Sequence, residues 1–153
     1  MSTPTLWVYK CNINEDACGD WKEFFEGDRK GTGEWGGTWC IKNPYSRQIL
    51  REEMEKGDLV LAWQTDQQQA VGLCRVVALL DGPDDGQDID TAIYLETVMR
   101  FPIPIKLLAF KKQYPELING NAFKQGKLGT LFDTKPDEAR VILQLCGVPK
   151  DLA

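Results

Sequence analysis

Apolar and polar positions along the chain alternate in short runs, which predicts short strands mixed with short helices. The first run, Leu6–Cys11, is rich in aromatic and β-branched residues and favours a strand. Alternate residues of a strand share a face, so Trp7 and Cys11 are expected to lie opposite Lys10. In a later run, Ala70–Leu80, both faces are partly apolar, which is typical of a barrel strand whose outer face is covered.

The later runs predict further elements of both kinds. Strands are expected at Asp58–Gln64, Ala70–Leu80, Ala92–Phe101 and Leu128–Phe132. Helical segments are expected at Asp20–Glu26, from Asn43-Pro44 through Met54 to a stop at Gly57, at Ile105–Lys112, and from Thr134 to Gly147. Loops are expected at Gly27–Gly37, Thr65–Gln69 and Asp81–Asp90. Because helices do not separate the strands regularly, the order indicates an α+β fold with a mixed or barrel-like sheet.

Length and composition predict one domain spanning residues 1–153. A chain of 153 residues with 42% hydrophobic and 27% charged residues is large enough to bury a full core without disulfides or metal. No apolar run approaches the ~20 residues of a membrane span, and the start carries no basic and apolar leader. A soluble, cytoplasmic protein without a membrane partner is therefore expected.

The absence of histidine narrows the chemistry more than any other feature of the composition. The sequence has none, which excludes Ser-His-Asp and Cys-His catalytic sites and every histidine-ligated metal site. Five cysteines are widely spaced without a CxxC pair, so they are expected to be reduced core thiols: Cys11, Cys18, Cys40, Cys74 and Cys146. We expect no catalytic residue, no metal and no cofactor. A nucleophilic Cys11 or Cys40 is the enzymatic alternative.

Charge is distributed unevenly along the chain. The net charge is −5, which argues against a general nucleic-acid coat. The segment from Arg100 to Lys127 nevertheless holds six basic residues and one acid, Glu116. This segment is either a local basic face or an ordinary solvated helix and loop.

Two apparent motifs lack the context that their function requires. Gly31–Gly36 matches G-x-G-x-x-G, but no strand precedes it and no helix is expected to follow, so a dinucleotide site is not indicated. Asp81–Ala92 resembles a calcium loop but has Pro83 and Ala92 where ligands are needed, and a solvated acidic loop is expected.

Several segments, taken in order, resemble the EVE and YTH families. Leu6–Asn12 resembles the first strand of these domains, with its lysine followed by a small residue. Gly37–Cys40, followed by Asn43-Pro44 and a helix, resembles the YTH segment that presents the first tryptophan of an aromatic cage. Gly57–Leu61, Val71–Leu73 and Gly129–Phe132 resemble later strands, so the resemblance covers the chain from about Leu6 to Cys146.

The resemblance implies a small, mixed PUA-like β-barrel flanked by helices, and a pocket for one flipped or unpaired base. By that resemblance Trp39 is a cage wall, Cys40 offers its backbone to the base edge, Asn12 reads that edge and Lys10 supports the site. Trp63 is the candidate second wall, because the stretch where YTH domains carry their second cage tryptophan has none here. A methylated base, including a modified cytosine, is the expected ligand.

Two functions from different classes follow from these observations. The first is a non-catalytic module that binds a modified base in single-stranded or flipped DNA or RNA, alone or beside a partner such as a nuclease. The alternative is a domain that uses the same pocket for a protein or a small ligand, which the net charge of −5 favours.

Overall fold

The structure is a computed structural model that describes residues 5–11, 21–26, 30–36, 48–81, 91–116, 123 and 131–147. Its strands are β1 (Leu6–Cys11), β2 (Thr32–Gly36), β3 (Leu59–Gln64), β4 (Gln69–Asp81), β5 (Thr91–Lys106) and β6 (Leu131–Phe132). Its helices are α1 (Trp21–Glu26), α3 (Leu107–Gln113) and α4 (Pro136–Leu145), with a π-helical turn η1 (Ile49–Glu53) and a 3₁₀ turn η2 (Thr65–Gln67).

The strands form one mixed six-stranded sheet in the order β2-β5-β4-β3-β1-β6. β1 runs parallel to β3, from Leu6 beside Leu59 to Cys11 beside Gln64, and every other neighbouring pair is antiparallel. The α+β prediction is confirmed. Within the ranges given above, β2 and β6 are the two ends of the sheet and no pairing joins them, so closure into a barrel stays a prediction.

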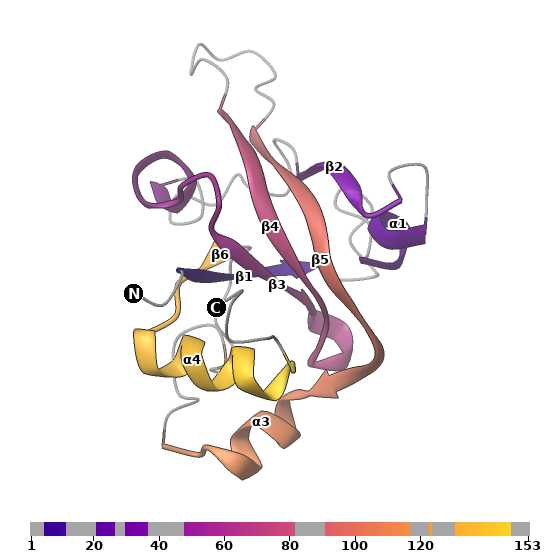
Figure 1. The fold of residues 1–153 in the computed structure, drawn as a ribbon, viewed down its shortest axis with the longest axis vertical. Helices are drawn as coiled ribbons and strands as arrows, with labels where there is room; N and C mark the ends of the chain where they lie inside the picture. Colours follow the sequence, from indigo (N-terminus) through magenta and orange to yellow (C-terminus); the bar gives the residue numbers. More distant parts are fainter. Residues whose placement is uncertain are drawn as a thin grey trace.

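Two apolar clusters lie on the two faces of this sheet. One includes Leu6, Val8 and Trp63 and is covered by α4 and by Phe110 of α3. The other includes Trp7, Tyr9 and Cys11 and is covered by α1 and η1. The alternation predicted for the first strand is therefore confirmed. Figure 1 shows the consequence: α3 and α4 lie together at one end of the molecule, and α1 lies beside β2.

The prediction of a loop over Gly27–Gly37 is wrong for its second half. Residues Thr32–Gly36 form β2, which pairs antiparallel with β5. The turn before it needs glycine, because Gly31 has a φ of +78° and a Cβ there would collide with the Thr97 side chain, whose Oγ1 donates to the Gly31 carbonyl at 2.7 Å. Pairing with a distant strand thus overrides the low strand propensity of a glycine-rich segment.

The prediction that β5 ends before Pro102 and Pro104 is also wrong, since the strand continues to Lys106. Gly72 of β4 pairs with Arg100 and Ala70 pairs with Ile105, so the four residues Phe101–Pro104 face Val71 alone. We call Phe101–Pro104 the β5 bulge. Proline is tolerated there because residues of a bulge do not donate to the ladder.

The helix expected from Asn43-Pro44 starts outside the described residues, and its described part is short. Only η1 is helical, and Met54 already has an extended backbone, so the helix ends before Met54 and not at Gly57. Gly57 lies in the following turn with a φ of +97°. The hairpin between β3 and β4, the short helix after β5 and the last helix are confirmed.

Candidate functional site

A cleft of about 300 Å³ opens between α1, the β3–β4 hairpin and the β5 bulge. It lies at the end of the sheet where the carboxyl ends of β1 and β3 meet, because Cys11 and Gln64 are paired there. Its walls have three kinds of side chain: aromatic rings from α1, carboxamides from the hairpin, and cations from α1 and β5.

The carboxamides come from three glutamines of the hairpin. Gln64 and Gln69 are paired across it and are only 6% and 7% exposed. The Gln69 Nε2 amide donates to Gln67 Oε1 at 2.6 Å, and Gln64 Oε1 accepts the backbone N–H of Trp21 at 3.5 Å. A carboxamide has both donors and an acceptor, so this wall can match a ligand edge that presents both.

The aromatic wall is fixed by contacts on several sides. The Trp21 Nε1 group donates to the backbone carbonyl of Trp63 at 3.1 Å, and the indole meets Tyr9 edge to face at 5.4 Å. Phe25 rests on Gly72 so closely that a Cβ there would lie 2.6 Å from the ring, so this placement requires glycine. Trp21 is itself 0% exposed and lies behind Phe25, so the partly exposed Phe25 ring is the surface that remains for stacking.

Cations stand at the mouth of the cleft. The Arg100 guanidinium lies over the Phe25 ring, 5.3 Å from its centroid, and pairs with Glu26 at 3.3 Å. Both partners of this ion pair are about half exposed, so the guanidinium keeps donors directed to solvent. Lys22 adds a second, exposed cation. The mouth therefore suits a ligand with an anionic group.

Lys10 and Trp63 are brought together as neighbours in the β1–β3 ladder, but on the face opposite the cleft. The Lys10 ammonium lies 4.5 Å from the Phe132 ring centroid, and burial lowers the pKa of Lys10 to about 8. Trp63 is 0% exposed and packs against Phe110 and Phe123, with ring centroids 6.2 and 5.4 Å apart.

No face of Trp63 is open to a ligand in this structure, and its Nε1 donor is buried without a partner. Its role as a cage wall stays a prediction. Asn12, Trp39 and Cys40 lie outside the described residues, so their roles stay predictions as well.

Sequence reasoning missed the three glutamines, Trp21 and Arg100 as site residues. It placed Gln64 at the end of a strand and Gln67 and Gln69 in a polar loop, and it gave Trp21 only a place in a short helix. One signal was present: glutamines at both ends of a short hairpin, Gln64 and Gln69, must face each other across it.

The described cysteines do not form an accessible reactive centre. Cys11, Cys74 and Cys146 are buried, and none of them forms a disulfide. Burial raises the pKa of the Cys74 thiol strongly and that of Cys146 to about 12, which disfavours the thiolate. Cys40 lies outside the described ranges. In the part of the chain that the structure covers, no group of three acidic or cysteine side chains is arranged to hold a metal ion.

No described helix is both long and apolar enough to cross a membrane.

No protein-family model matches the chain, and no curated protein matches it either. Solved structures do share its fold. The human THYN1 protein in complex with 5-methylcytosine-containing DNA matches with a TM-score of 0.69 and 15% identity, over 92% of this chain and 96% of that one. The DUF55 domain of human thymocyte nuclear protein 1 matches with a TM-score of 0.68 and 16% identity, over 94% and 99% of the two chains.

A third structure extends the similarity to a second family. The YTH domain of the Zygosaccharomyces rouxii MRB1 protein, in complex with N6-methyladenosine RNA, matches with a TM-score of 0.59 and 16% identity, over 98% and 93% of the two chains. The resemblance to EVE and YTH domains that the sequence indicates is thus confirmed at the level of the fold.

Proposed function

We propose that this chain is a non-catalytic module that binds a single modified base of a nucleic acid in an aromatic pocket at the carboxyl ends of β1 and β3. The observation that carries the proposal is the cleft, where the carboxamides of the hairpin, the partly exposed Phe25 ring with Trp21 behind it, and two cations converge. Two structures of the same fold hold nucleic acids with a methylated base, 5-methylcytosine DNA and N6-methyladenosine RNA, which supports this ligand class.

The chemistry of the cleft suits one nucleotide. Its volume of about 300 Å³ is at the lower end of the ~300–1,000 Å³ of small-molecule sites, so it fits one ring and not several. The carboxamides of Gln64, Gln67 and Gln69 match the donors and acceptors of a base edge. Arg100 and Lys22 at the mouth match the phosphate that every nucleotide carries.

The residues expected from the sequence complete the proposal. Trp39 is a cage wall, Asn12 and the backbone of Cys40 read the base edge, and Lys10 supports the site from the opposite face of the sheet. A methyl group gains from transfer into such an aromatic environment, while stacking on an aromatic side chain contributes ~1–3 kcal/mol per base. Trp63 lies directly behind Trp21, whose indole N–H it accepts through its carbonyl.

The test is a fluorescence titration of the whole chain with short single strands of DNA and RNA, each carrying one 5-methylcytosine, one N6-methyladenine or no modification. We expect saturable quenching by a modified strand. Gln69→Leu should weaken that binding about tenfold, because it removes hydrogen bonds from a buried edge. Gln113→Leu, at an exposed glutamine of α3, should leave it unchanged.

Trp39→Ala tests the predicted cage and should abolish binding while the thermal unfolding midpoint stays the same. Normal binding by Gln69→Leu would show that the cleft is not the pocket, and normal binding by Trp39→Ala would remove that residue from it.

The alternative, a pocket for a protein or a small ligand, is favoured by the net charge of −5. Salt separates the two functions. Binding that weakens steeply from low to moderate salt indicates phosphate contacts, whereas no binding of any strand at low salt supports the alternative.

A further inference from the structure

The β5 bulge carries an apolar side chain that the fold itself does not use. Ile103 is 82% exposed, between Pro102 and Pro104. An exposed isoleucine on an irregular strand contributes nothing to the core, and the two flanking prolines fix φ near −65° on either side of it. The bulge therefore holds an apolar tip in a defined backbone conformation in water.

This tip stands at the rim of the cleft. Both prolines that flank Ile103 line the cleft, together with Arg100 just before the bulge. A ligand group that enters the cleft must pass beside them, so whatever remains outside lies within reach of Ile103.

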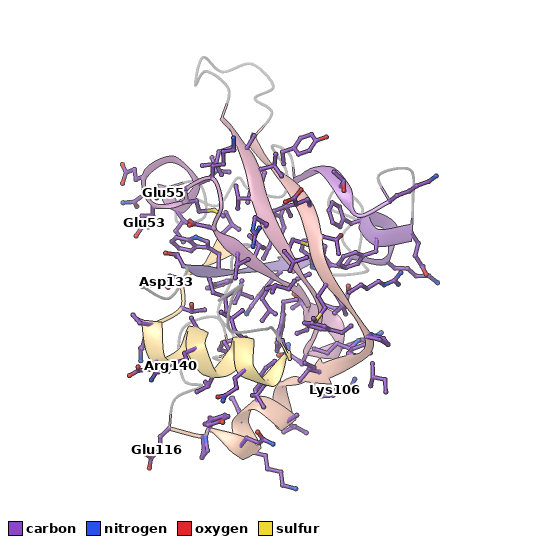
Figure 2. The ribbon with its side chains drawn as sticks, viewed as in Figure 1. Glu53, Glu55, Lys106, Glu116, Asp133 and Arg140 are labelled. Atoms are coloured by element: carbon purple, nitrogen blue, oxygen red, sulfur yellow. The ribbon has the colours of Figure 1, made fainter. Side chains whose placement is uncertain are left out.

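The chain segment around the tip is basic, and the acidic Glu26 of α1 meets it at Arg100, in the half-exposed ion pair described above. From Arg100 to Pro115 the sequence contains four basic residues, Arg100, Lys106, Lys111 and Lys112, and no acidic one. Lys106 is exposed where β5 leads into α3, whereas the acidic side chains of Glu53 and Glu55 lie on the far side of the molecule (Figure 2). A polyanion thus fits this side of a chain whose net charge is −5.

We propose that Ile103 is a wedge that enters the base stack of a duplex and fills the place of the base that the cleft takes up. This inference rests on the proposed function and adds how a paired base reaches the pocket. Extruding a base costs a few kcal/mol of stacking and pairing, and apolar side chains inserted between base steps offset part of that cost. Arg100 and Lys106, before and after the tip, hold the phosphates on either side of the gap.

The experiment compares duplexes with their modified strands alone, using 5-methylcytosine and N6-methyladenine probes with 2-aminopurine next to the modified base. Ile103→Ser should weaken duplex binding about tenfold, since the unstacking is no longer offset, and should change single-strand binding less than twofold. The rise in 2-aminopurine fluorescence that the wild type causes should be lost. Leu108→Ser removes a second exposed aliphatic side chain, 79% exposed on α3, and should change neither duplex binding nor the 2-aminopurine signal.

Each outcome decides the proposal. If the wild type binds the single strands and Ile103→Ser keeps its full affinity for the duplex, the wedge is overturned and the base reader stands. The same holds if Leu108→Ser loses as much duplex affinity as Ile103→Ser. A wild type that binds no strand at all overturns both. Both variants change exposed side chains, and an unchanged thermal midpoint establishes that they are folded.

Discussion

Trp63 and Gln64 are consecutive residues at the end of β3, yet they face two different environments. Trp63 faces the cluster covered by α3 and α4, where Phe110 and Phe123 enclose it completely. Gln64 faces α1 and forms part of an open cleft with polar walls. The comparison shows how one strand contributes to two environments: one side chain stabilises the fold, and the next lines a cleft.

The largest effect is expected on stability, from truncating the enclosed side chain of Trp63. Trp63→Ala should lower the free energy of unfolding by about 3–5 kcal/mol, because it leaves a cavity among aromatic rings. Chemical denaturation measures this loss, and Trp63→Phe, which keeps a ring, should lose less. A loss below about 1 kcal/mol would contradict the enclosure of Trp63, since core truncations of this size cost more.

A smaller, pH-dependent effect is expected from Lys10 beside it. Burial holds its pKa at about 8 in the folded state, against 10.5 for the free side chain. Between these two values the unfolded state binds more protons, so the free energy of unfolding should rise as the pH increases from about 8 to 10.5. Lys10→Met should flatten this rise, measured as the difference from the wild type at each pH.

The matched control for Lys10 is Lys106→Met, at an exposed lysine, which should keep the rise. If the free energy of unfolding of Lys10→Met still rises between pH 8 and 10.5 as in the wild type, a group other than Lys10 causes the rise.

The smallest effect is expected on the cleft side, from Tyr9. Its hydroxyl is buried without a hydrogen-bond partner beneath Trp21, and burial raises the pKa of Tyr9 well above its usual value. Tyr9→Phe should leave the protein as stable or stabilise it by up to ~1 kcal/mol, because an unpaired buried hydroxyl is removed. Thermal unfolding measures the change, and a marked loss of stability would reveal a partner for the hydroxyl.

Local patterns in the sequence predict the elements that need no distant partner. β1 and α1 are set by their own residues, since Trp21, Phe24 and Phe25 already share one side of a helical turn. β2 is missed because its glycines disfavour a strand, and only its ladder with β5 makes it one. The β5 bulge is missed for the same reason. Whether a proline ends a strand depends on the pairing with the opposite strand, and here β4 places only Val71 opposite the bulge.

The site is less predictable than the fold. The cleft unites residues from α1, the hairpin and β5, which are far apart in the sequence, and glutamines have no periodic pattern that distinguishes a pocket from a solvated turn. Trp63 shows the opposite difficulty, because an aromatic residue in a strand is typical of both a core and a cage. Only the packing of Trp63 against Phe110 and Phe123 in the structure identifies it as a core residue.

The place of β1 between β3 and β6 governs when this chain can fold. Val8 and Tyr9 pair with Phe132 and Leu131 on one side, and Leu6 accepts the Thr134 hydroxyl from 128 residues away at 2.6 Å. On the ribosome, β1 therefore emerges long before either of its neighbours. Contacts of such high contact order form slowly, because the loops between them must close first. An apolar strand with two unpaired edges is a template for aggregation, so nascent chains that stop before Leu131 should depend on chaperones.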